Sequence, residues 1–166
     1  PASPWYQQVD ADRFGRLGHS MGGGAVLLAA TGDARIKALV TLAAADTRPP
    51  AGAALAELAL PALYFYGTQD RITPAQQHAL ALYAQAGEPK MALGIDGGCH
   101  CGFLDRDFPF CDAGALDRAD QLQITREKIT AFFDASLRGL PQAREQLLAF
   151  SPGLIVQGEA PSLISE

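Results

Sequence analysis

Apolar segments alternate along the chain with stretches that favour helices. Candidate strands lie at residues 14–17, 36–44, 61–67 and 90–95. The second of them is a nearly continuous apolar run, as expected for a parallel strand that is buried on both faces. Helices are expected at about 21–31, within 46–60, at 75–86 and at about 125–137. This alternation is typical of an α/β fold, predicted here as three layers (αβα) with a mostly parallel sheet in the middle.

The same pattern predicts the domain organisation. Residues 1–138 are expected to form one partial α/β domain, and residues 139–166 a C-terminal tail in which 142–150 favour a short helix. Within the domain, Thr73 is expected to cap the helix predicted at 75–86, with Pro74 in its first turn. The length of 166 residues suits a single domain.

A glycine-rich stretch, residues 18–24, contains the first candidate for chemistry. It reads G-H-S-M-G-G-G and matches the pattern G-x-S-x-G around Ser20. A strand before it and a helix after it favour a nucleophile elbow over a glycine-rich helix start with an incidental serine. Gly18 and Gly22 are expected to keep side chains away from the neighbouring backbone of this tight turn. The turn would present the Ser20 hydroxyl at a helix N-terminus, where free N–H groups stabilise negative charge.

A serine hydroxyl needs a base to act as a nucleophile near neutral pH, and three histidines are available. His100 lies in a Gly-Gly-Cys-His-Cys-Gly segment after the last predicted strand, where an open backbone can present an imidazole, and is the predicted base. His19 adjoins the serine, but its side chain is expected to point away from the turn. His78 falls in the helix predicted at 75–86 and is expected to be a surface or half-buried residue.

The base in turn needs a carboxylate that fixes its tautomer. Asp70, just after the strand predicted at 61–67, is favoured for this role. Asp46 also follows a strand and is the main alternative, while Asp96 and Asp105 lie closer to His100 in sequence. The favoured nucleophile, acid and base each follow a predicted strand, so all three should emerge at one edge of a parallel sheet.

With these motifs in place, the sequence resembles the C-terminal half of an α/β-hydrolase. The matching pieces are residues 18–23, 66–74 and 97–103, within a stretch from about 13 to 137. The chain is most similar to small bacterial esterases of the dienelactone-hydrolase, chlorophyllase and cutinase-like type. The resemblance implies an α/β-hydrolase fold that lacks its N-terminal strands, and hydrolysis of carboxylic esters through an acyl-serine intermediate.

The resemblance also implies the role of each site residue. Ser20 would be the nucleophile, His100 the base and Asp70 the acid that orients the base. The backbone N–H of Met21 would form one half of the oxyanion hole. Members of the superfamily carry further strands ahead of the elbow, and a loop there supplies the second oxyanion N–H. The chain is therefore expected to be a fragment of a longer enzyme that folds poorly and shows little activity in isolation.

The expected substrate is a small-molecule or polymeric ester. The segment 46–60 is too short to hold a large lid over the serine. Met21, Ile72 and Phe103 are candidates for an apolar substrate pocket, with His19 as a further candidate. A rival hypothesis is a non-catalytic relative that acts as a binding module. Such relatives usually lose the nucleophile or the base, and this sequence keeps candidates for both.

Three cysteines lie close together in the sequence. A disulfide between Cys101 and Cys111 is expected, with Cys99–Cys111 as the alternative, and it would hold the loop that carries the predicted base. Cys99 and His100 are adjacent, which strains shared tetrahedral ligation, so no metal site is expected. The disulfide would indicate an extracytoplasmic protein, and free thiols a cytoplasmic one.

Charge and hydropathy narrow the classes of partner. The chain has a formal net charge of −5 and shows no basic patch, which argues against a nucleic-acid partner. No apolar run approaches the length needed to span a bilayer. Acyl transfer through a serine needs no cofactor, and none is expected.

Overall fold

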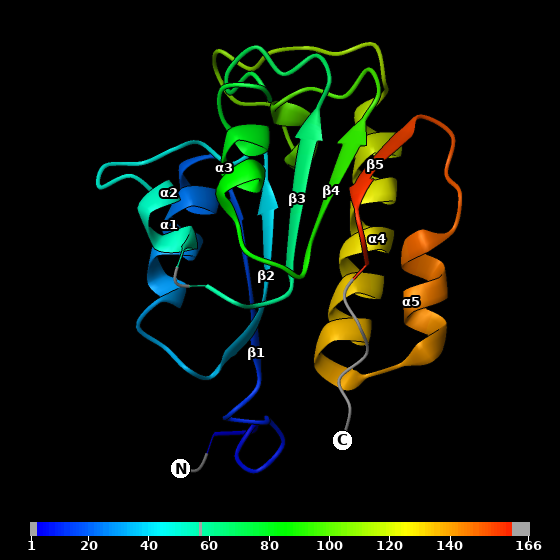
Figure 1. The fold of residues 1–166 in the computed structure, drawn as a ribbon. Helices are drawn as coiled ribbons and strands as arrows, with labels where there is room; N and C mark the ends of the chain where they lie inside the picture. The colour runs from blue at the N-terminus through cyan, green and yellow to red at the C-terminus, as the bar shows by residue number, and fades with distance from the viewer. Residues whose placement is uncertain (1–2, 57, 161–166) are drawn as a thin grey trace.

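A twisted sheet of five strands runs through the middle of the computed structural model, which describes residues 3–56 and 58–160 (Figure 1). The strands are β1 (Phe14–His19), β2 (Ile36–Leu42), β3 (Ala62–Gly67), β4 (Lys90–Ile95) and β5 (Leu154–Gly158), in that order across the sheet. Strands β1 to β4 are parallel, and β5 pairs antiparallel with β4. The predicted three-layer α/β fold with a mostly parallel sheet is confirmed.

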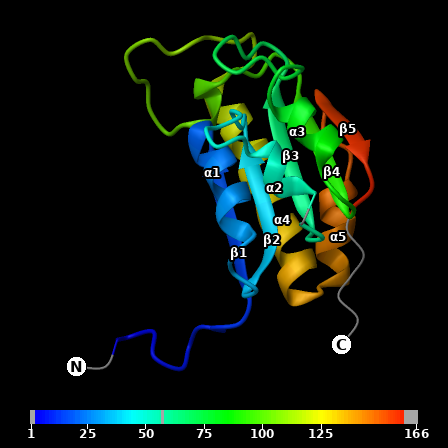
Figure 2. The same ribbon diagram turned by 60° about the vertical axis from the view of Figure 1, so that its left-hand side comes forward.

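Helices cover both faces of the sheet (Figures 1 and 2). They are α1 (Met21–Ala30), α2 (Gly52–Leu55), α3 (Ala79–Gln85), α4 (Arg118–Arg138) and α5 (Pro141–Leu148), with a 3-10 turn at Cys101–Phe103. Successive residues of a strand point to opposite faces, so Tyr64 and Phe65 of β3 enter different cores. Tyr64 packs on the side of α1, α2 and α3, and Phe65 on the side of α4 and α5. None of the helices described is long and apolar enough to cross a membrane.

Two helix starts differ from the prediction. Helix α3 begins at Ala79, because residues 75–78 form turns, so the prediction that Thr73 caps it was wrong. Helix α4 begins at Arg118, well before the predicted 125, because Asp117 caps it and accepts a hydrogen bond from the amide of Ala119 at 2.7 Å. The first turns of α4 are mostly polar, so the apolar periodicity that indicates a helix is weak in this part of the sequence.

The segment predicted as a tail adds one helix and one strand. Helix α5 lies where a short helix was expected, whereas the strand β5 was not predicted. Strand β5 begins with a short apolar run at residues 154–156, and all of its residues are half-buried or exposed at the edge of the sheet. Residues 161–166 of this segment lie outside the described residues.

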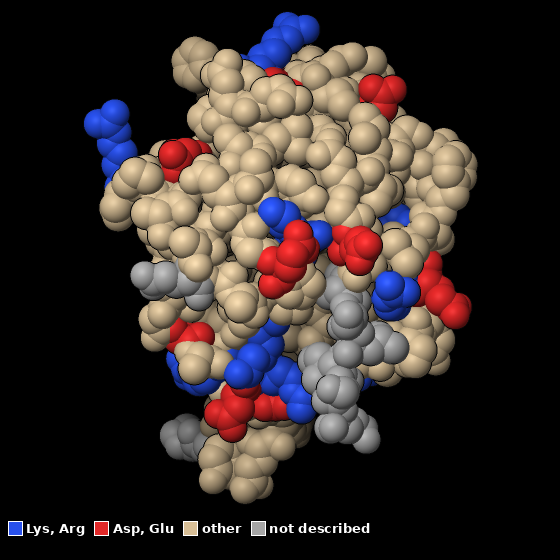
Figure 3. Space-filling model, viewed as in Figure 1, with Lys and Arg blue, Asp and Glu red and all other residues tan. Residues whose placement is uncertain are grey.

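The parallel strands bring the candidate site residues to one edge of the sheet. Ser20 follows β1, Asp70 follows β3 and His100 follows β4. In Figure 1 the arrowheads of β2, β3 and β4 point to the upper end of the picture, where the connecting loops gather. In the same orientation, Figure 3 shows acidic and basic residues side by side in the centre and lower part of the view and fewer charges at the upper end, without a large area of one sign.

Candidate active site

Ser20 lies at the sharp turn between β1 and α1. Its φ of 56° is positive, a conformation that residues other than glycine rarely adopt. Its amide donates to the carbonyl oxygen of Leu42 at 2.9 Å, and its own carbonyl oxygen accepts from the amide of Ala45 at 2.9 Å. The last residue of β2 and the segment after it thus bind both the amide and the carbonyl group of Ser20 and hold the strained turn. Strained backbone of this kind is common at functional residues.

Two glycines allow α1 to pack close to the strands. A Cβ on Gly18 would collide with the carbonyl group of Gly22, and a Cβ on Gly23 would lie 2.7 Å from the Cβ of Ala44. The similar role predicted for Gly22 was wrong, because no atom lies within 4 Å of where its Cβ would be. The glycine that follows the G-x-S-x-G pattern, rather than its last glycine, therefore seats the helix.

A buried aspartate–histidine pair lies at the same edge of the sheet. Asp70 Oδ2 and His100 Nδ1 are 2.9 Å apart, and the two side chains are 1% and 5% exposed. The other carboxylate oxygen, Oδ1, accepts from the amides of Ile72 at 2.9 Å and Thr73 at 2.7 Å. An ionised carboxylate can only accept, so this contact favours the tautomer of His100 in which Nδ1 carries the proton and Nε2 has the free lone pair.

Thr73 also belongs to this cluster, although the sequence assigned it to a helix cap. Its Oγ1 lies 2.9 Å from both Asp70 Oδ2 and His100 Nδ1. A threonine followed by proline before a helical segment is an ordinary capping signal, so the sequence pattern pointed to the wrong partner.

Asp112 joins the loop of the aspartate to the loop of the histidine, and sequence analysis missed it. Its carboxylate accepts from the amides of Arg71 at 3.0 Å, His100 at 3.1 Å and Cys101 at 3.0 Å. Burial by itself would raise the pKa of Asp112, but these three backbone hydrogen bonds outweigh it, so the pKa is lowered. Nothing in the local sequence separates Asp112 from the other aspartates of its loop.

The backbone on either side of His100 is held by side chains and a covalent bond. The structure pairs Cys101 with Cys111, whose Cα atoms are 5.6 Å apart, as predicted. Cys99 is a buried free thiol, so the alternative Cys99–Cys111 pairing was wrong. The buried amide of Gln121, on α4, accepts from the Cys99 amide at 3.0 Å and donates to the Cys99 carbonyl oxygen at 2.9 Å.

The ring of His19, a pocket candidate in the sequence, lies against the ring of His100. The two ring centroids are 4.5 Å apart, and His19 Nε2 donates to the His100 carbonyl oxygen at 3.2 Å. Burial lowers the pKa of His19 below its ordinary 6.5, and the nearby His100 lowers it further. His19 is therefore neutral at pH 7.

This burial predicts a pH-dependent stability. As the pH falls below 6.5, the unfolded chain protonates His19, whereas the folded protein keeps it neutral until a lower pH. The free energy of unfolding should therefore decrease between pH 7 and about pH 5, and should decrease less in His19→Gln. Urea unfolding of both proteins at the two pH values measures the difference. Equal losses would contradict the prediction.

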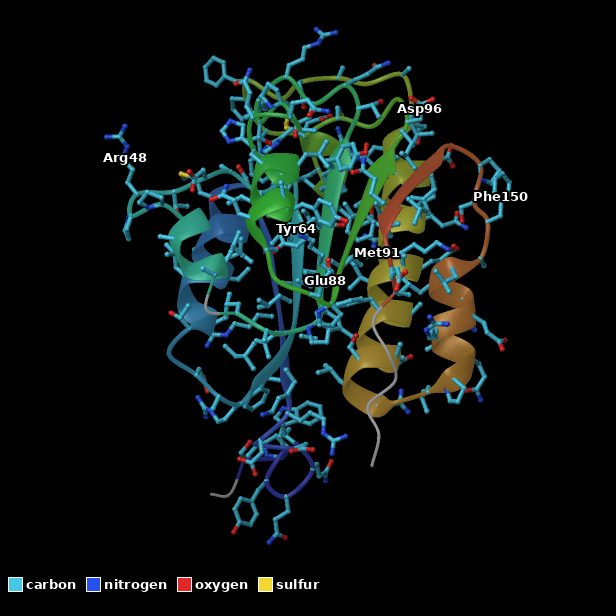
Figure 4. All side chains as sticks on the ribbon, in the orientation of Figure 1. Arg48, Tyr64, Glu88, Met91, Asp96 and Phe150 are labelled. Atoms are coloured by element: carbon cyan, nitrogen blue, oxygen red, sulfur yellow. A yellow bond between two sulfur atoms is a disulfide. The ribbon has the colours of Figure 1, made fainter. Side chains whose placement is uncertain are left out.

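The other candidate carboxylates and histidine bond elsewhere. Asp46 accepts from two backbone amides of its own loop. Asp96, at the end of β4, accepts from a threonine hydroxyl at 3.2 Å, and Asp105 forms an exposed ion pair with an arginine of α4 (Figure 4). His78 is half-buried just before α3 and contacts the Asp46 amide. In the part of the chain that the structure describes, none of the four contacts His100.

The apolar candidates differ in exposure. Met21 is 73% exposed and Ile72 is 45% exposed, whereas Phe103 is buried in the core beside Phe65. Ser20 is partly exposed, and no hydrogen bond joins its hydroxyl to a described residue. The hydrogen bond between a catalytic serine and its base is often long until a substrate binds.

These features define an α/β-hydrolase-type protein. They are a mostly parallel sheet covered on both faces, a strained serine between a strand and a helix, and a histidine–aspartate pair at the carboxyl edge. A family model described as PET hydrolase-like matches residues 1–106, more than half of the chain, and the chain belongs to this family. The matched segment contains the elbow and the aspartate–histidine pair and ends before α4.

A curated relative supports the same relationship. Lipase 1 of Moraxella sp. (strain TA144) is 34% identical to the chain over 92 residues. The match covers 55% of this chain and 27% of the lipase, so the chain corresponds to little more than a quarter of that relative's length.

Proposed function

We propose that the protein hydrolyses carboxylic esters, with Ser20 as nucleophile, His100 as base and Asp70 as the acid that orients the base. The observation that carries the proposal is the buried Asp70–His100 pair, 2.9 Å apart, at the sheet edge from which Ser20 emerges. A family named for PET hydrolase and a relative named as a lipase support the same class of reaction.

In the first half-reaction, Ser20 Oγ attacks the ester carbonyl carbon while His100 Nε2 takes the hydroxyl proton. The imidazolium that forms still donates from Nδ1 to the carboxylate of Asp70, which stabilises its charge. The amide of Met21, as the first residue of α1, has no partner within the helix and can donate to the oxyanion. The alcohol then leaves with the proton from Nε2, and the acyl group stays on the serine.

In the second half-reaction, water replaces the alcohol. His100 Nε2 takes a proton from the water as its oxygen attacks the acyl carbon. The second tetrahedral intermediate collapses, Ser20 Oγ recovers the proton from Nε2, and the carboxylic acid is released. The base therefore ends the cycle neutral, with its proton on Nδ1.

Esters with apolar groups, small or polymeric, fit the surroundings of the serine. Among the described residues of the connection between β2 and β3, the four-residue α2 is the only helix, and this connection is too short to form a large lid. Met21 follows Ser20 in the sequence, Ile72 lies close to Asp70, and both expose apolar side chains that such a substrate could contact.

A series of p-nitrophenyl esters and a serine-directed phosphonate test the proposal on the full-length protein. We expect hydrolysis, and covalent labelling located at Ser20 by mass spectrometry of the digested protein. A folded protein that shows neither hydrolysis nor labelling would contradict the proposal and favour a non-catalytic binding module.

A further inference from the structure

The hydroxyl group of Thr73 lies where three loops of the sheet edge meet. Thr73 is buried, and its Oγ1 lies 2.9 Å from Asp70 Oδ2, 2.9 Å from His100 Nδ1 and 3.1 Å from the carbonyl oxygen of Ala43. These partners follow β3, β4 and β2 respectively. One small polar group therefore contacts all three loops.

The available donors decide how the protons are arranged. A threonine hydroxyl donates one hydrogen bond and accepts up to two. Among the described residues, Thr73 is the one that donates a hydrogen bond to the carbonyl oxygen of Ala43. Both carboxylate oxygens of Asp70, in contrast, also accept hydrogen bonds from other groups. When the Thr73 hydroxyl donates to the carbonyl oxygen of Ala43, the lone pairs of Oγ1 face Nδ1–H of His100. That proton is then shared between Thr73 and Asp70.

The acceptor of the hydroxyl proton is itself an unusual residue. Ala43 has a φ of 45°, which residues other than glycine rarely adopt, and such strain persists only where its surroundings hold it. Two residues further on, the amide of Ala45 donates to the carbonyl oxygen of Ser20 at 2.9 Å. The same short segment therefore binds both the serine turn and Thr73.

We propose that Thr73 is a positioning residue that holds the Nδ1–H tautomer and the orientation of His100 through a hydrogen bond shared with Asp70. This inference rests on the proposed ester hydrolysis. Two acceptors on different residues restrict rotation of the imidazole more than one acceptor does. The restricted ring keeps the lone pair of Nε2 available to Ser20 in the ground state, which raises kcat without a contact to the substrate.

Thr73→Val tests the inference in the full-length protein, because valine has nearly the same shape and lacks the hydroxyl. We expect kcat for a p-nitrophenyl ester to fall about ten- to a hundredfold with KM nearly unchanged, since the substrate contacts stay in place. Thr73→Ser restores the hydroxyl and should recover most of kcat. If valine lowers the folded yield, Thr73→Ala takes its place in the comparison.

Thr68→Val is the matched control. Thr68 lies in the same loop, and its hydroxyl donates to Asp96 at 3.2 Å and accepts from the amide of Gly97 at 2.9 Å, without contact to His100. This variant loses a threonine hydroxyl at the same edge and should keep wild-type kcat. Thr68 is exposed and Thr73 is buried, so this variant controls for the loss of a hydroxyl in this loop, and Thr73→Ser controls for the buried position itself.

Nitrogen-15 NMR of labelled histidine separates this inference from the proposed function. We expect one tautomer of His100, protonated at Nδ1, in the wild type, and a mixture of tautomers in Thr73→Val. A Thr73→Val protein with wild-type kcat and a single tautomer would overturn the role of Thr73 alone. Absence of turnover in the wild type would overturn ester hydrolysis, and the NMR comparison would still decide whether Thr73 holds the ring.

Discussion

Ser20→Ala should lower kcat for ester hydrolysis on the order of a millionfold and abolish phosphonate labelling. Alanine keeps the Cβ and removes only Oγ. The hydrogen bonds that hold the turn are made by the backbone of residue 20, and its φ of 56° strains serine and alanine alike. The fold should therefore survive, with a thermal midpoint close to that of the wild type by circular dichroism.

Ser151→Ala provides the control for this experiment. Ser151 lies in the connection between α5 and β5, and its carbonyl oxygen, which the substitution keeps, accepts from the amide of Leu154. This variant should show wild-type kcat and no loss of labelling. A Ser20→Ala protein that kept more than about a hundredth of wild-type kcat would rule out this serine as the nucleophile.

Asp70→Asn should lower kcat by about ten-thousandfold, the second largest effect that we expect. The amides of Ile72 and Thr73 both donate to Oδ1, so the asparagine must place its carbonyl oxygen there. Its NH2 group then faces His100 Nδ1, which has to accept instead of donate. The proton of the neutral ring moves to Nε2, and the base loses the lone pair that takes the proton of Ser20. Measurement of kcat and KM should show the loss almost entirely in kcat.

Asp46→Asn distinguishes Asp70 from the alternative that the sequence left open. Asp46 accepts from the amides of Thr47 and Ala51 and has no contact with His100. Its asparagine variant should hydrolyse esters at the wild-type rate. Loss of activity in Asp46→Asn together with full activity in Asp70→Asn would reverse the two assignments.

Local patterns carried most of the prediction of the fold. Parallel strands that are buried on both faces need continuous apolar runs, and these are visible in the sequence at β2 and β3. The apolar run of the edge strand β5 spans only residues 154–156, so this strand was missed. The polar first turns of α4 have little apolar periodicity, so this helix was predicted too short. The predicted start of α3 was wrong because Thr73 and Pro74 form an ordinary start signal, which the buried partners of Thr73 override.

In the candidate site, too, the residues with a local sequence signal were predicted and those without one were missed. A nucleophile elbow depends on residues that are neighbours in the chain, so Ser20 was recognisable from its own context. The pairing of Asp70 with His100 was inferred from strand order, because parallel strands bring their carboxyl ends to one edge, and from the resemblance to α/β-hydrolases. Asp112 and Gln121 could not be inferred, since Asp112 bonds the backbone of the loop after β3 and Gln121, on α4, bonds the backbone of Cys99.

The sequence by itself determined the order of the four parallel strands and of the helices, and the serine turn. It favoured the Cys101–Cys111 disulfide but left Cys99–Cys111 open. Only the tertiary structure decided which carboxylate meets His100, and that Thr73 turns its hydroxyl toward this pair rather than toward a helix. The physical reason is that local propensities act over a few residues. A buried hydroxyl or carboxylate, in contrast, must find a hydrogen-bond partner wherever the folded chain brings one within reach.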